Sequence, residues 1–133
     1  MRNCLLVLGL LFTMVTPHAV ASGAQSDWLA KVEKEMPMLG HRNWILVVDS
    51  AYPLQTSPGI ETIETNADQV DVVRSVLGVI DHSIHVRPSI FMDAELPFVP
   101  DADAPGASAY RAQIRTLLSG SKIESLPHEK LIG

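Results

Sequence analysis

The fold of this chain is decided by residues 39–53, which read LGHRNWILVVDSAYP. Gly40 can adopt a left-handed backbone without penalty, so it is expected to end a preceding helix. Residues 44–48 (WILVV) form an unbroken apolar run, which is typical of a strand covered on both faces. Asp49 follows this run, and ligands of open α/β sheets bind outside the carboxyl ends of strands. Two titratable side chains, His41 and Asp49, therefore bracket the predicted strand.

The rest of the chain alternates between strand and helix patterns. Valine, leucine and isoleucine recur at helical spacing over residues 70–80. Asn66-Ala67-Asp68 opens this predicted helix, and Asp68 near its start suits the helix dipole. The other expected elements are a helix from Trp28 capped by Ser26-Asp27, a helix over 108–118, a helix start at 127–130, and strands over 60–64, 84–92 and 122–126. Residues 93–106 are expected to form a loop that could serve as a lid. This order predicts an α/β fold, with a single three-layer domain around a mostly parallel sheet.

The first 21 residues read as a secretory signal peptide. Arg2 precedes an apolar run over residues 5–15, and Ala19-Val20-Ala21 offers a small-residue cleavage site. An uncleaved membrane anchor is the alternative, although the apolar run is short for a bilayer span. Residues 22–27 would form a flexible junction and residues 28–133 the folded domain. We therefore expect an exported protein, periplasmic or extracellular, with no membrane association after cleavage.

Composition narrows the class of partner. The net charge of −5 argues against nucleic acid and against anionic membrane surfaces, and is compatible with an uncharged ligand such as a sugar. The single cysteine, Cys4, lies in the predicted signal peptide, so packing alone must stabilise the mature domain. Because so small a domain buries only a modest fraction of its surface, self-association would help it.

The ordered set Gly40-His41, a short polar link, an apolar strand and Asp49-Ser50-Ala51-Tyr52-Pro53 resembles the RbsD/FucU family of sugar mutarotases. The resemblance runs from about Trp28 to the end of the chain and is strongest over 39–53. It implies a ribose pyranase or fucose mutarotase activity on a free monosaccharide, no cofactor, and a homo-oligomeric ring with sites between neighbours. The family continues through a helix into a final strand with a Tyr and an Asn, which this sequence does not match. The domain is therefore expected to be C-terminally incomplete.

His41 and Asp49 are the predicted catalytic residues. Opening a sugar ring needs only proton transfer, and a histidine titrates near neutral pH, so it can take and return that proton. Each residue also has a structural interpretation, because a histidine can bind free helix carbonyls and an aspartate can cap a turn. Eight residues of chain separate the two, so they meet only if the link folds back or if they come from neighbouring subunits.

Three further residues are predicted to bind the substrate. Asp93 ends a predicted strand at the same edge as Asp49, and Arg87 is a candidate rim residue. Pro127-His128-Glu129 resembles the family's Ser-His-Glu element, whose histidine lines the sugar site. His82 and His85 have helical ligand spacing, but without a third ligand we predict no metal site. Two alternatives to an enzyme stay open, namely a non-catalytic sugar-binding module on the same fold and a structural assembly domain.

Overall fold

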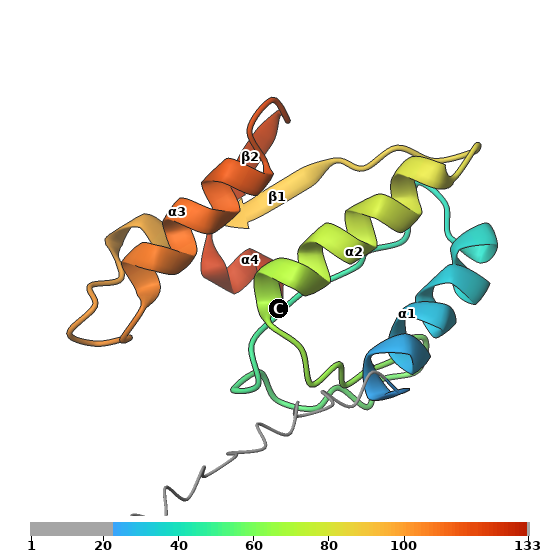
Figure 1. Ribbon diagram of the computed structural model, residues 1–133, viewed down its shortest axis with the longest axis horizontal. Helices are drawn as coiled ribbons and strands as arrows, with labels where there is room; N and C mark the ends of the chain where they lie inside the picture. The colour runs from blue at the N-terminus through green and yellow to red at the C-terminus, as the bar shows by residue number, and fades with distance from the viewer. Residues whose placement is uncertain (1–22, 133) are drawn as a thin grey trace, which may run out of the picture.

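The computed structural model describes residues 23–132 as a mixed α/β fold with a small parallel sheet (Figure 1). In chain order the elements are α1 (Gly23–Glu35), α2 (Gln69–His82), β1 (Ile90–Asp93), α3 (Ala107–Leu117), β2 (Ile123–Leu126) and α4 (His128–Ile132). Short 3₁₀ helices at Met36–Met38 and Leu96–Phe98 follow α1 and β1. β1 and β2 pair in parallel, with Ile90 opposite Ile123 and Asp93 opposite Leu126.

The N-terminal helix begins earlier than the sequence predicts. The predicted signal peptide over residues 1–21 lies outside the described residues. α1 starts at Gly23, so the expected start at Trp28 behind a Ser26-Asp27 cap is wrong. The reason is that Ala24 and Gln25 favour a helix and nothing before Trp28 interrupts it. Within residues 23–132, no helix is long and apolar enough to cross a membrane.

Two apolar clusters hold the helices together, and the second of them also packs against β1. In the first cluster, Trp28 of α1 packs against Val72 and Val76 of α2. The second cluster joins α2 and α3 through Val70, Ile114 and Leu118, and β1 contributes Ile90 and Met92 to it. α2 therefore lies between α1 and α3, and it contributes buried side chains to both clusters (Figure 1).

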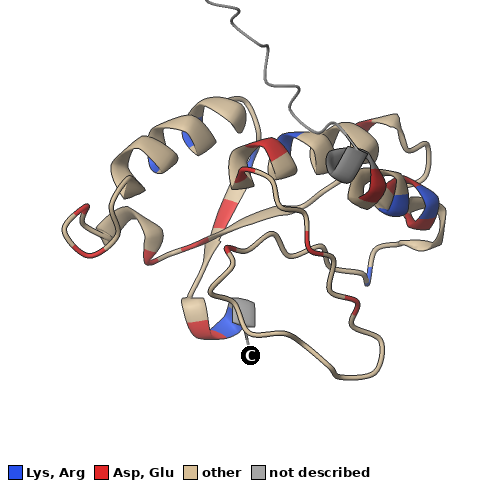
Figure 2. Cartoon of the chain, turned by 60° about the horizontal axis from the view of Figure 1, so that its bottom comes forward, with Lys and Arg blue, Asp and Glu red and all other residues tan. Residues whose placement is uncertain are grey.

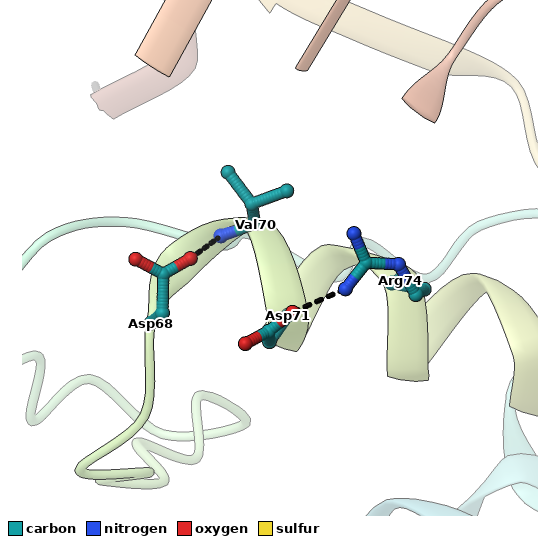
Figure 3. Close-up of polar contacts among 4 residues, drawn as sticks. All are labelled: Asp68, Val70, Asp71 and Arg74. Carbon is teal, nitrogen blue, oxygen red and sulfur yellow. Dashed lines mark hydrogen bonds and ion pairs between the residues drawn. The ribbon is translucent and has the colours of Figure 1, made fainter. Parts of the chain in front are cut away.

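The predicted helix over residues 70–80 is confirmed as α2, and the structure shows that Asp68 caps it. The Asp68 carboxylate (Oδ1) accepts a hydrogen bond from the Val70 backbone N–H at 2.9 Å, as Figure 3 shows. One turn later, the exposed side chains of Asp71 and Arg74 form an ion pair. The cap satisfies an N–H group that has no carbonyl partner within the helix, whereas the ion pair lies in water.

We expect Asp68→Ala to lower the free energy of unfolding by about 1 kcal/mol, because it removes this cap. Arg74→Gln is the matched control in the same turn, and it should change stability by less than about 0.5 kcal/mol. Urea unfolding followed by circular dichroism measures both variants. Equal losses in the two variants would contradict the capping role.

Several strand predictions are wrong. Residues 44–48 are extended but belong to no strand, and their side chains are largely exposed, with Trp44 at 70%. Residues 60–64 likewise form no strand. The strand predicted over 84–92 is confined to Ile90–Asp93, because Pro88 has no N–H to donate to a ladder.

The predicted role of Gly40 is also wrong. α1 ends at Glu35, ahead of the 3₁₀ turn that contains Pro37, so the helix stops before it reaches the glycine. The left-handed glycines of the described chain are Gly59, Gly106 and Gly120 instead. Pro37 lacks the N–H that a continuing α-helix would need, so the proline rather than the glycine sets the end of the helix.

Candidate functional site

The candidate site lies at the carboxyl end of the sheet. β1 ends at Asp93, and β2 is followed, after Pro127, by His128, the first residue of α4. The extended segment 44–48 runs beside β1 in the same direction and ends at Asp49 (Figures 1 and 2). Asp93 and His128, two of the five predicted site residues, therefore lie at one edge of the fold.

A histidine–carboxylate pair forms at this edge. His128 Nδ1 lies 2.5 Å from Asp93 Oδ2, although the two residues are 35 positions apart. The other oxygen of Asp93, Oδ1, accepts a hydrogen bond from the Glu95 backbone N–H at 2.7 Å. The Ala94 N–H donates to the Leu126 carbonyl at 2.9 Å, which ties the end of β1 to the end of β2. Both partners are thus held in place by the backbone around them.

The pair shifts the pKa values of both side chains. The hydrogen bond with Asp93 raises the pKa of the His128 imidazole above its usual 6.5, and the charge of Asp93 adds to this effect. Burial alone would raise the pKa of the Asp93 carboxyl, but the Glu95 N–H and His128 outweigh it and lower that pKa below 3.8. The charged form of each group is therefore favoured by its neighbour.

The geometry fixes the tautomer of His128. An ionised carboxylate only accepts hydrogen bonds, so the Nδ1 atom facing Asp93 carries the proton. In the neutral imidazole, the lone pair then lies on Nε2, which can act as a base. About half of the His128 side chain is accessible to solvent, so a ligand can reach it. An oriented imidazole at a strand end can both accept and donate a proton.

The two predicted catalytic residues do not meet within this chain. His41 is exposed in a turn closed by a 2.9 Å hydrogen bond from the Asn43 N–H to the Gly40 carbonyl. Asp49 is also exposed, and its Oδ1 accepts from the Ala51 N–H at 2.9 Å, which is the turn-capping arrangement. The extended residues 44–48 between them span roughly 16 Å.

Arg87 lies at the other end of β1 from the pair. Its guanidinium donates to the carbonyls of Ser83 and Val86 at 2.7 and 2.6 Å. Arg87 and Asp93 are six positions apart along the chain, a span of roughly 20 Å when extended. Arg87 therefore stabilises the turn after α2, and the structure does not bring it to the candidate site.

The histidines near the end of α2 also contact backbone carbonyls. His82 Nδ1 lies 2.6 Å from the Gly78 carbonyl, and His85 Nε2 lies 3.0 Å from the Leu39 carbonyl. Across residues 23–132, no group of three or more His, Cys, Asp or Glu side chains could hold a metal ion. These contacts give both imidazoles a structural role.

The loop over residues 93–106 is tethered to α3. Arg111 donates to the carbonyls of Val99 and Leu96 at 2.5 and 3.4 Å, and the Asp101 carboxylate accepts from the backbone and hydroxyl of Ser108. Tyr110 is half-buried in the first turns of α3, where burial and the nearby carboxylates of Asp49 and Asp68 raise its pKa. These anchors do not favour the expected role as a lid.

Two grooves of the described chain lie away from the pair. One, of about 730 Å³, is bounded by α1 and the end of α2 and includes Met36, His82 and His85. The other, of about 920 Å³, lies between α2 and α3 and includes Asp68 and Gln113. Neither of these two grooves is lined by Asp93 or His128.

Sequence reasoning named both members of the pair but did not predict their contact. The available signal was position, because Asp93 and His128 each follow a predicted parallel strand. That the two strands are neighbours became visible only from the register of the sheet.

Comparison of the chain with protein-family models, curated proteins and solved structures finds no match.

Proposed function

We propose that this protein is a mutarotase or pyranase that interconverts the ring or anomeric forms of a free aldose. One observation carries the proposal, namely the 2.5 Å contact between His128 Nδ1 and Asp93 Oδ2 at the carboxyl end of the sheet. It supplies an oriented imidazole without a metal or nucleotide, which is all that such proton transfer requires. His128 takes the catalytic role that the sequence assigned to His41, and Asp93 becomes the residue that positions it.

The reaction uses the free nitrogen of His128. Nε2 removes the proton of the anomeric hydroxyl, the C1=O double bond forms, and the bond between C1 and the ring oxygen breaks. A water molecule protonates the released ring oxygen, and the imidazolium neutralises the resulting hydroxide. When the same hydroxyl attacks the aldehyde on either face, the reversed steps give the two anomers. When a different hydroxyl of the open chain attacks C1, they give the other ring form. Asp49, at the same edge, is proposed to bind a sugar hydroxyl.

The wider proposal follows the family resemblance. It includes a three-layer RbsD/FucU-like domain, export from the cytoplasm and assembly into a homo-oligomer. The extended segment 44–48 supports assembly, because its side chains Trp44 and Leu46 leave apolar surface in water. The second candidate function is a sugar-binding module without catalysis. The capping hydrogen bond on Asp49 favours that alternative, since it occupies one oxygen of the second acidic group.

Exchange NMR of ribose, fucose, galactose and glucose with the mature protein tests the proposal, at values from about pH 5 to about pH 9. We expect faster exchange with at least one sugar, with a rate that rises as His128 loses its proton above its raised pKa. In Asp93→Asn the acid limb of the plot of exchange rate against pH should move to lower pH, because the pKa of His128 returns toward 6.5. Asp101→Asn, in the loop before α3, is the matched control and should leave the limb in place.

Each outcome of this experiment discriminates between the candidates. If the acid limb of the rate–pH plot stays at the same pH in Asp93→Asn, Asp93 does not set the pKa of the catalytic histidine, and the proposed role of the pair is wrong. Sugar-dependent shifts of the His128 resonances without faster exchange would favour the binding module. A protein that neither binds nor accelerates any of the four sugars would be neither a mutarotase nor a sugar-binding module.

A further inference from the structure

The extended segment 44–48 is the one feature of the fold that the proposed function leaves unexplained. It lies beside β1 and runs in the same direction toward the same edge (Figures 1 and 2). Its amino end contacts β1 through Trp44 and Phe91, whose ring centroids are 5.4 Å apart. Val47 packs against the cluster of Trp28, Val72 and Val76. The segment is therefore held where a further strand of the sheet would lie, although it is not paired with β1.

The backbone of this segment is left largely open. Among the described residues, one hydrogen bond reaches the backbone of residues 44–48. Gln69 Nε2 donates it to the Val47 carbonyl at 3.2 Å. β1 pairs with β2 along one edge, and in the described sheet its other edge has no ladder partner. The amino end of this segment thus contacts β1 through the rings of Trp44 and Phe91, and both backbones have unpaired N–H and C=O groups. Such groups form the ladder of a parallel sheet when the strands come within about 4.8 Å.

We infer that residues 44–48 dock on the free edge of β1 as a third parallel strand when the substrate binds, and that docking brings Asp49 to the Asp93–His128 pair. The inference rests on the proposed function for the identity of the substrate. The apolar and β-branched composition of the segment suits a strand, and two strands alone make a marginal sheet. Docking converts an open edge into a site with one imidazole and two carboxylates.

Turns at both ends of the segment can absorb the movement. Before it, the Asn43 N–H closes a turn on the Gly40 carbonyl, and after it the Tyr52 N–H donates to the Asp49 carbonyl at 3.2 Å. A sugar that contacts both Asp49 and His128 binds only the docked arrangement, so it shifts the equilibrium toward docking. By linkage, any change that favours docking also tightens sugar binding.

Hydrogen exchange of single amides tests the inference, on the mature chain with and without a saturating amount of the most active aldose. In a docked edge strand, alternate N–H groups face β1. We therefore expect alternate amides among residues 45–48 to exchange at least about tenfold more slowly with sugar, as ladder pairing requires. Either uniform exchange at the unprotected rate with sugar bound, or the same protection without sugar, would overturn docking.

Two proline variants provide an independent measurement. Ile45→Pro and Leu46→Pro remove consecutive N–H groups that point to opposite edges, and both side chains are partly exposed. We expect one variant to weaken sugar binding about tenfold or more and the other to leave it nearly unchanged. Equal effects of the two variants would overturn the inference. If no sugar shifts the His128 resonances, the proposed function fails as well, whereas binding at His128 without protection of 45–48 rejects docking alone.

Discussion

Replacing His128 by glutamine is expected to lower the sugar ring-exchange rate by about 100- to 10,000-fold, the usual contribution of a general acid/base group. Glutamine keeps a hydrogen-bonding side chain of similar length but cannot carry a proton in the relevant pH range. It can still donate to the Asp93 carboxylate, so the end of β1 and the start of α4 keep a contact. The loss is therefore expected in the rate rather than in the fold, and exchange NMR with the most active aldose measures it.

His82→Gln is the matched control. His82 is exposed, and the one hydrogen bond described for it joins its Nδ1 to the Gly78 carbonyl. It should retain the exchange rate of the unsubstituted protein. His41→Gln separates the two catalytic assignments, since the sequence alone favours His41. A large loss in His41→Gln together with full activity in His128→Gln would reject the Asp93–His128 pair as the catalytic centre. Circular dichroism of all three variants verifies that the fold is kept.

The largest loss of stability is expected from Ile114→Ala, at about 2–5 kcal/mol. Ile114 is 3% exposed and joins α3 to Val70 of α2 and to the β1 side chains Ile90 and Met92. Truncation to alanine leaves a cavity among these groups and removes their shared contacts. A domain of this size has a total stability of about 5–15 kcal/mol, so a large part of it would be lost. Urea denaturation measures the change.

Ile84→Ala is the matched control for this prediction. The same side chain is removed, but Ile84 is 97% exposed in the turn after α2. Its stability should change by no more than about 0.5 kcal/mol. A similar loss in both variants would mean that the cluster around Ile114 does not form the core of the domain.

The sequence predicted those elements that depend on local patterns. α2 is the clearest case, because the spacing of Val70, Val76 and their neighbours and the cap at Asp68 all act within one helix. α3 and β2 were also predicted close to their observed bounds. The segment 44–48 was predicted wrongly because a strand needs a partner and a cover. Both are tertiary properties that an apolar run does not encode.

The same distinction applies to the site. Asp93 was named as a ligand residue because it ends a predicted strand, whereas His128 was named chiefly because Pro127-His128-Glu129 resembles a family element. Their contact depends on β1 and β2 being neighbours with Asp93 opposite Leu126, which no local pattern specifies. His41 and Asp49 show the converse, since they are close in sequence yet lie at opposite ends of an extended segment.

The exposure of residues 44–48 has a consequence for the behaviour of the protein in concentrated solution. Five consecutive apolar residues in an extended conformation form the kind of template on which other chains add strands and aggregate. Arg42 and Asp49 flank this run with opposite charges, as gatekeeper residues do at the ends of aggregation-prone strands. The charge of Asp49 therefore helps to keep this segment soluble, in addition to the ligand contact proposed for it. An uncharged residue at position 49 is therefore expected to lower the solubility of the protein as well as the sugar binding proposed for it.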